Sequence, residues 1–257
     1  MNKTNTPSPQ HLLTGFHAVR MRIKLAASSI QEVLVDKERR DPRVRDLLMM
    51  CKSAHITVIQ TDESRLNKLC SGHTRHQGVV AMASAMPQLM TIADVLEQCA
   101  ELNVAPFLLV LDGITDPRNL GACLRVADGA GIHAVIAPKD RAAPLNDIAQ
   151  QTAAGAGESI PYILVTNLAR SLDELVEAGV TIIGLADEAT QTLHHSHLTG
   201  ALAVVMGAEG DGMRRLTRER CDTLISIPML GAVESLNVSV ATGVVLYEAV
   251  RQRSQLL

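Results

Sequence analysis

The sequence predicts an α/β protein in which a C-terminal parallel sheet, covered by helices on both faces, is preceded by a small N-terminal α/β unit. Continuous apolar runs alternate with helical stretches, a pattern typical of parallel sheets. The composition agrees, because 47% of the 257 residues are hydrophobic and 20% are charged, which suits a sizeable core. A chain of this length accommodates two modest domains.

The N-terminal part reads as a small α/β unit. Its expected elements are strand 31–36, helix 41–54, strand 55–60, helix 63–72 and strand 77–83. A loop and a short helix begin at Pro87, so the boundary is expected there. Residues 1–83 then form one domain, 84–105 a linker and 106–257 the second domain.

The second domain is predicted from apolar runs separated by helical stretches. Strands are expected at 107–112, 132–138, 161–166, 180–186, 201–206 and 223–228, and helices at 117–129, 145–155, 168–178, 213–221 and 235–253. Ser235 is the expected N-cap of the last helix. The apolar face of that helix is expected from Leu236, Val240, Val244 and Val250, which follow at near-helical spacing.

Charge divides the chain more sharply than the net value of −3 suggests. Residues 1–83 carry +6 and residues 84–257 carry −9. A basic first part favours contact with a polyanion such as RNA. The candidate phosphate contacts are Arg20, Arg22, Lys24, Lys37, Arg39, Arg40, Arg43 and Arg45.

Several classes of protein are disfavoured by the sequence. No apolar run approaches the ~20 residues of a membrane span, and no apolar signal core opens the chain, so a cytoplasmic location is expected. Five scattered cysteines without a Cys-x-x-Cys pair argue against disulfides and zinc. The histidines of 194–197 are expected in a surface loop and no metal is expected. Phosphate-loop and Gly-x-Ser-x-Gly patterns are also missing from the sequence.

Ligands gather at the carboxyl ends of parallel strands, so the loops after three of the expected strands are the candidate site. These loops span 111–131, 205–213 and 226–243. The second contains three glycines around a single glutamate, and the third places polar side chains in the first turns of a helix. The polar residues that the three loops contribute are Asn119, Arg125, Glu209, Ser235, Asn237 and Ser239.

In this order the three loops resemble the motifs of the SpoU-type RNA ribose 2′-O-methyltransferases of the SPOUT class. The resemblance rests on Asp116-Pro-x-Asn119-x-Gly-x-x-x-Arg125, Met206-Gly-x-Glu209-Gly, and Ile227-Pro followed by Asn237-x-Ser239. The resemblance covers about 106–253, and this part of the sequence is similar to the branch of the family that methylates a guanosine ribose in 23S rRNA. Residues 1–83 resemble, more weakly, the RNA-binding domain of that branch.

The resemblance implies a methyl transfer from S-adenosyl-L-methionine to a ribose 2′-hydroxyl of 23S rRNA, carried out by a homodimer. It implies a deep trefoil knot, with about 201–253 threaded through a loop. The residues implied at the cofactor are Gly207, Ile227 and Leu236, and those implied in catalysis are Arg125, Asn119, Glu209, Asn237 and Ser239.

Two of the implied catalytic residues have alternative roles. A guanidinium stays protonated in proteins, which favours Arg125 as a ligand of phosphate and of developing charge over Arg125 as a base. Glu209 either assists the reaction or holds the glycine loop.

The sequence leaves three other functions as alternatives. The first is the same chemistry on tRNA or on another rRNA nucleotide. The second is a doubly wound enzyme that binds NAD, although the early Gly-rich turn of such enzymes is missing from the sequence. The third is a catalytically idle rRNA-binding assembly protein, against which the three intact motifs argue.

Overall fold

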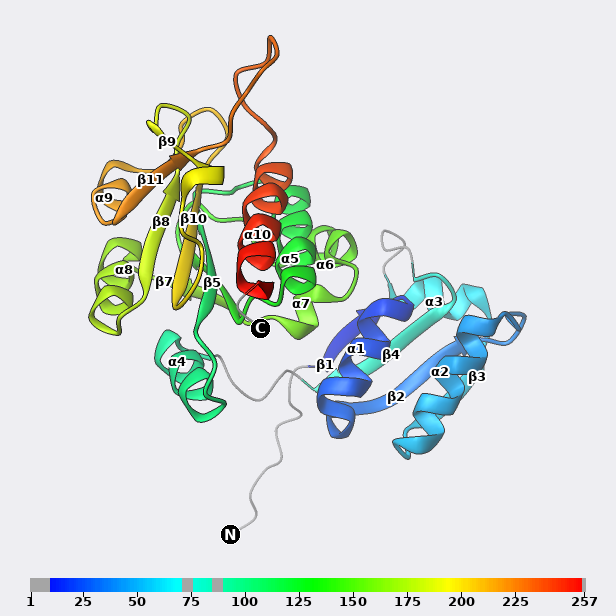
Figure 1. Cartoon of the computed structure of the whole chain (residues 1–257). Coiled ribbons are helices and arrows are strands. Elements are labelled where there is room, and N and C mark those ends of the chain that lie inside the picture. Colours follow the sequence, from blue (N-terminus) through cyan, green and yellow to red (C-terminus); the bar gives the residue numbers. More distant parts are fainter. Residues whose placement is uncertain (1–9, 71–75, 85–89, 256–257) are drawn as a thin grey trace. The chain divides into compact units, whose positions relative to one another are not determined.

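The computed structural model describes residues 10–70, 76–84 and 90–255 (Figure 1). The chain folds into two compact units. Unit 1 comprises Met1–Leu89 and Ala154–Ser159, and unit 2 comprises Met90–Ala153 and Ile160–Leu257. A short segment from the middle of the sequence therefore belongs to the N-terminal unit.

Unit 1 contains a four-stranded sheet in the order β1-β4-β2-β3. Its elements are β1 (Gln10–Thr14), α1 (Phe16–Ala26), η1 (Ala27–Ser29), β2 (Ile30–Asp36), α2 (Pro42–Ser53), β3 (Thr57–Thr61), α3 (Glu63–Leu69), β4 (Val79–Ser84) and α7 (Ala156–Ser159). Strand β4 is antiparallel to β1 and β2, whereas β3 is parallel to β2. Helices α1 and α2 pack on one hydrophobic cluster of the sheet and α3 on another. Strand β1 and helix α1 were not among the elements expected from the sequence.

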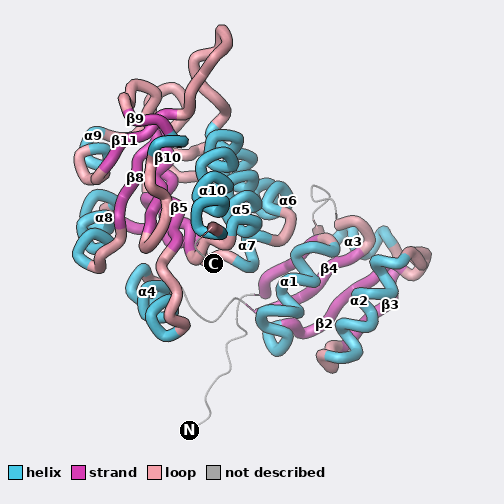
Figure 2. Tube along the Cα trace, in the orientation of Figure 1, coloured by secondary structure: helices cyan, strands magenta, loops and turns pink. Residues whose placement is uncertain are grey.

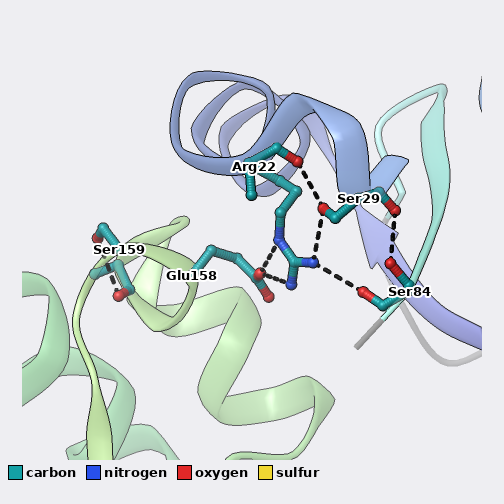
Figure 3. A network of polar contacts seen from close by, with 7 residues as sticks. Arg22, Ser29, Ser84, Glu158 and Ser159 are labelled. Carbon is teal, nitrogen blue, oxygen red and sulfur yellow. Dashed lines mark hydrogen bonds and ion pairs between the residues drawn. The ribbon is translucent and has the colours of Figure 1, made fainter. Parts of the chain in front are cut away.

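A buried ion pair joins α1 to α7 (Figure 3). The Nε of Arg22 donates to Glu158 at 2.8 Å, a second guanidinium nitrogen pairs with the same carboxylate, and a third donates to the carbonyl of Ser84 at 3.1 Å. The side chains of Arg22 and Glu158 are only 2% and 3% exposed. Arg22 was expected to contact RNA phosphates, and this expectation was wrong because the guanidinium is enclosed and already paired.

Unit 2 is built on a seven-stranded sheet in the order β7-β6-β5-β10-β8-β11-β9, with every neighbouring pair parallel. Its elements are α4 (Ile92–Glu101), β5 (Phe107–Asp112), α5 (Pro117–Ala130), β6 (Ala134–Pro138), α6 (Asp147–Ala153), β7 (Tyr162–Val165), α8 (Leu168–Glu177), β8 (Thr181–Leu185), β9 (Gln191–Thr192), η2 (Leu193–His195), β10 (Leu202–Gly207), α9 (Arg215–Arg218), β11 (Thr223–Ser226) and α10 (Val238–Ser254). The predicted parallel sheet is confirmed.

Helices flank both faces of this sheet (Figure 2). Helices α4 and α8 contribute to one buried cluster with β5, β6, β8 and β10. Helices α5, α6 and α10 pack together elsewhere, with α5 between the other two. Helix α4 lies inside the segment expected to be a linker, yet its Val95 and Cys99 are part of the core of unit 2.

The start of α5 follows from its sequence. Asp116 is the N-cap, and its side chain accepts a hydrogen bond of 2.8 Å from the backbone N–H of Arg118. Pro117 occupies the first turn, where its missing N–H is harmless. Gly131 ends the helix in the left-handed conformation. Both ends of α5 are thereby fixed by the local sequence.

The start of α10 differs from the expectation. The helix begins at Val238 and its N-cap is Asn237, so the expected cap at Ser235 was wrong. Val240 and Val244, expected on the buried face, are 51% and 38% exposed. The buried face is formed instead by Val238, Ala241, Thr242, Val245, Leu246 and Ala249. After β11, on the far side of β8, the chain returns to pack α10 against α5. The knot itself stays a prediction.

Candidate active site

Three loops of unit 2 meet in one hydrogen-bonded cluster. The Nδ2 of Asn237 donates to Glu209 at 2.6 Å and to the amide oxygen of Asn119 at 3.1 Å. The Nδ2 of Asn119 donates to the same oxygen of Glu209 at 3.1 Å. Asn119 and Asn237 are 118 positions apart in the sequence, so the fold brings residues of all three sequence motifs together.

Ser239 joins this cluster through Asn237. Its backbone N–H and its hydroxyl donate to the side-chain oxygen of Asn237 at 3.0 and 2.6 Å. The carboxamide of Asn237 therefore caps α10 with its oxygen while its nitrogen holds the other two motifs. One side chain thus links the beginning of a helix to the geometry of the site.

The glycine loop that carries Glu209 is a tight hairpin. Strand β10 ends beside β5, with Gly207 in register with Asp112. Ala208 and Gly212 then exchange two backbone hydrogen bonds of 3.0 Å. A Cβ on Gly207 would lie 2.3 Å from the carbonyl carbon of Gly212, so only glycine fits there without moving backbone. This close approach fixes where Glu209 stands.

The far end of the glycine loop is held by an ion pair that sequence reasoning missed. Asp112 is 1% exposed and accepts from the backbone N–H of Arg214 at 2.9 Å and from its Nε at 2.6 Å. The sequence signal that could have revealed this ion pair is Asp112 itself, a charged residue at the end of a continuous apolar strand. Its arginine partner, 102 positions away, gave none.

A cavity of about 570 Å³ opens beside Glu209 and is called the first cavity here. The three residues expected at the cofactor, Gly207, Ile227 and Leu236, all line it, as do Glu209 and Asn237. The charged lining residues are Asp187, Glu188, Glu209, Asp211, Glu234 and Arg218. Five acids against one arginine favour a ligand with positive charge. Its volume is within the range typical of small-molecule sites.

Two perturbed groups lie at or near this cavity. The pKa of Glu188 is lowered by its own backbone N–H and by the guanidinium of Arg218, with which it pairs. Burial raises the pKa of the Cys123 thiol to about 11. This thiol contacts the Thr242 hydroxyl at 3.6 Å and is not ionised at neutral pH, which makes it a poor nucleophile.

Arg125 does not join the cluster within this chain. It is exposed on α5 and lines neither the first cavity nor a second cavity that is also lined by Glu209. Residues six positions apart on a helix are separated by about 240° around the axis and about 9 Å along it. Asn119 and Arg125 therefore leave α5 in different directions.

Within the part of the chain that the structure describes, no group of three or more His, Cys, Asp or Glu is placed to hold a metal ion. The histidines of 194–197 are exposed, in and beside the turn η2. None of the helices described is long and apolar enough to span a bilayer.

Comparison with known protein families finds two matches that divide the chain. Residues 106–247 match the SpoU rRNA Methylase family, and residues 12–89 match the family of RNA 2′-O ribose methyltransferase substrate binding domains. The first match covers more than half of the chain and contains Asn119, Arg125, Glu209 and Asn237.

Curated relatives are similar over nearly the whole length. A protein of Ralstonia nicotianae named 23S rRNA (guanosine-2′-O-)-methyltransferase RlmB is 56% identical over 96% of this chain and 98% of its own. The protein of that name from Escherichia coli K12 is 51% identical over 95% and 99%.

Solved structures show the same fold. An RNA 2′-O ribose methyltransferase superposes with a TM-score of 0.76 at 25% identity, covering 97% of this chain and 90% of the other. The SpoU methyltransferase AviRb of Streptomyces viridochromogenes, crystallised with the cofactor AdoMet, gives a TM-score of 0.73 at 24% identity and covers 95% and 90%.

Proposed function

This chain belongs to the SpoU rRNA methylase family, and from that membership we propose that it transfers a methyl group from S-adenosyl-L-methionine to the ribose 2′-hydroxyl of a guanosine in 23S rRNA. The observation that carries the proposal is the hydrogen-bonded cluster of Asn119, Glu209 and Asn237, of which Glu209 and Asn237 line the first cavity. Each member comes from a different motif of the family, and the relatives named for this reaction match almost every part of the chain.

The first cavity fits the methyl donor. Gly207 lines the cavity at a point where the backbone of Gly212 and Met213 leaves no room for a Cβ, and the acidic lining suits a ligand that carries a positive sulfonium. When bound, S-adenosyl-L-methionine supplies a methyl group on a sulfur that leaves as a neutral thioether. The cavity residues Gly207, Ile227 and Leu236 would hold it, and the protein's main task is to align the acceptor oxygen and exclude water.

Asn119, Asn237 and Ser239 orient the reacting groups. The two amides fix the carboxylate of Glu209, and Ser239 fixes the amide of Asn237. We assign Glu209 primarily to this structural task, because it accepts two hydrogen bonds from neighbouring side chains at the loop tip. The result is a site whose polar atoms are aligned before the ligands arrive.

We assign Arg125 to the phosphate beside the target ribose and to charge that develops on the oxygen, because its planar fork of donors suits both tasks and it stays protonated. Its direction on α5, away from Asn119, and its absence from the lining of both cavities support an action outside its own chain's cluster. The neighbouring surface of α10 exposes Val240, Val244 and Tyr247, an apolar face that a second copy of the chain would cover. We therefore infer a homodimer in which Arg125 serves the partner's site.

Mixed dimers test this assignment. One subunit carries Arg125→Ala, and the other carries Gly207→Ala, which displaces its glycine loop and weakens its cofactor site. If Arg125 acts across the interface, the mixed dimer keeps one complete site and regains activity that neither parent has. If mixing restores nothing although dimers form, Arg125 acts within its own chain and the inference is wrong.

Unit 1 is assigned to RNA binding. The basic side chains of Lys24, Lys37, Arg40, Arg43 and Arg45 are exposed there. Binding through them weakens as salt concentration rises, since each phosphate contact releases counterions. We place the reaction in the cytoplasm, where 23S rRNA is available.

The function is tested with labelled S-adenosyl-L-methionine and 23S rRNA from cells that lack the protein. Methylation is expected at a guanosine ribose, and Arg125→Ala should lower the rate by at least ~10²-fold, as loss of charge stabilisation does elsewhere. Arg170→Ala, on the exposed side of α8, is the matched control. Methylation of tRNA alone would contradict the assignment of 23S rRNA as the substrate. Binding of rRNA without methyl transfer would contradict the proposed methyltransferase activity.

A further inference from the structure

The second cavity, of about 450 Å³, lies against the first and has charged side chains that the proposed reaction does not use. The two cavities share Ala208, Glu209, Asp211, Gly212 and Val238 as lining residues. Asn119 lines the second cavity, so the polar cluster stands at the boundary between the two. A ligand in the second cavity is therefore next to whatever the first one holds.

Arg141 reaches this cavity from the loop after β6. The loop is fixed by a 2.7 Å hydrogen bond from the N–H of Ala143 to the carbonyl of Ile114 and by the Tyr162 hydroxyl, which donates to the carbonyl of Ala143 at 3.1 Å. Arg141 itself has a φ of 60°, in the left-handed region that costs a side-chain-bearing residue free energy. A strained arginine on an anchored loop, exposed at a cavity, points to a ligand role.

The charges of the second cavity disfavour phosphate. Its lining contains four acids, Asp112, Asp116, Glu209 and Asp211, against Arg141 and Arg214. Arg214 is neutralised by Asp112, and Glu209 is occupied by two amides. The remaining excess of negative charge repels a phosphodiester, whereas it suits a neutral group that presents N–H donors.

Asp116 is placed to accept from such donors. One of its carboxylate oxygens caps α5, and the other has no hydrogen-bond partner among the residues that the structure describes. Arg141, in the same cavity, offers donors. Guanine matches this pair, because its N1–H and 2-amino group donate on one edge while O6 and N7 accept on the other. Adenine has an acceptor at N1, and uracil has no exocyclic amino group.

We propose that the second cavity holds the base of the target guanosine, with Asp116 accepting from its Watson–Crick edge and Arg141 donating to O6 and N7. The inference rests on the proposed function, and it names the residues that select the base. With the base there, the ribose lies at Glu209 and Asn119, and its 2′-hydroxyl faces the first cavity.

The test uses a fragment of 23S rRNA with guanosine, inosine or 7-deazaguanosine at the methylated position. Inosine lacks the 2-amino group and 7-deazaguanosine lacks N7. The wild-type protein should lose about tenfold or more in kcat/KM with either analogue, the discrimination of one well-placed base contact. Asp116→Asn keeps the helix cap, because Asn caps as well as Asp, but it changes the acceptor. Arg141→Lys keeps the charge and loses the planar fork.

Each variant should lose discrimination against one analogue only. Asp116→Asn should methylate the guanosine and inosine fragments at similar rates and still reject 7-deazaguanosine, and Arg141→Lys should show the reverse. Arg170→Lys should behave as the wild type does. Variants that slow all three fragments equally, or that keep both wild-type ratios, would overturn the proposal while the methyltransferase function stands. A wild-type protein that fails on the guanosine fragment would overturn the function itself.

Discussion

Replacing Asn237 separates two tasks that this side chain performs at once. Asn237→Ser keeps a hydroxyl that caps α10 about as well as Asn, so the part of the free energy of unfolding that comes from the cap should change by only a few tenths of a kcal/mol. The change removes the Nδ2 donor to Glu209 at 2.6 Å and to Asn119 at 3.1 Å. A hydrogen bond to a charged group contributes about 1.5–3 kcal/mol when enclosed, and these residues are largely exposed, so about 1–2 kcal/mol is expected.

That loss corresponds to a fall in kcat of roughly 5- to 30-fold, since about 1.4 kcal/mol is a factor of ten. Asn237→Ala loses the same contacts and the cap as well, so its free energy of unfolding should be about 1 kcal/mol lower than that of the Ser variant. Single-turnover methylation and urea denaturation of both variants measure the two effects separately. If the Ser variant methylates at the wild-type rate, the contact between Asn237 and Glu209 does not position the reaction and the reasoning is refuted.

Three further predictions concern the supports of the fold and the site. Glu158→Ala leaves Arg22 buried without its carboxylate and should lower the free energy of unfolding of unit 1 by about 3–5 kcal/mol in urea denaturation. The double variant Arg22→Met with Glu158→Leu should recover most of this lost stability. A loss under ~1 kcal/mol for Glu158→Ala would contradict the burial of the ion pair. Gly207→Ala should displace the glycine loop and lower kcat/KM by about 10²-fold, with weaker cofactor binding by calorimetry, while Gly231→Ala, which meets no atom within 4 Å, should do neither. The pKa of His133 is lowered from 6.5 by burial and by Arg253, and its Nδ1 accepts from the N–H of Phe107 at 2.9 Å. Neutral His133 therefore contributes its full stabilisation above pH 6.5, and this contribution is lost as the pH falls through the lower pKa of the folded state. His133→Asn should make the melting temperature depend less on pH in this range, as thermal denaturation can measure.

Elements fixed by strong local signals were predicted from the sequence, and those fixed by distant partners were not. The strands β5 and β10 were predicted because each is a continuous apolar run, fully or almost fully buried on both faces. The predicted start of α10 was wrong because Ser235 and Asn237 are both residue types that cap helices well. Its predicted buried face was wrong because apolar residues lie on two sides of the helix. Arg22 could not be recognised as a core residue, since Glu158 lies 136 positions away.

The candidate site shows the same division. The three motifs predicted which loops meet, but the sequence alone does not reveal that Asp112 holds Arg214 or that Arg141 reaches a cavity beside Asn119. Both depend on the order of strands in the sheet. The separation of Asn119 from Arg125 could have been predicted, because residues six positions apart on a helix point in different directions even when they belong to the same motif.

The side chains of this site also build the elements that carry them, which constrains how the site can work. Asp116 caps α5, Asn237 caps α10 and Asp112 secures the end of the glycine loop. Moving any of these side chains onto a ligand would therefore unfold a helix end or release a loop. Ligands must consequently use the polar atoms that remain, such as the second carboxylate oxygen of Asp116 and the Ser239 hydroxyl oxygen as an acceptor, since its proton is already donated to Asn237. A site of this kind loses little conformational entropy when it binds, and its contribution to the rate lies in alignment that already exists in the folded chain.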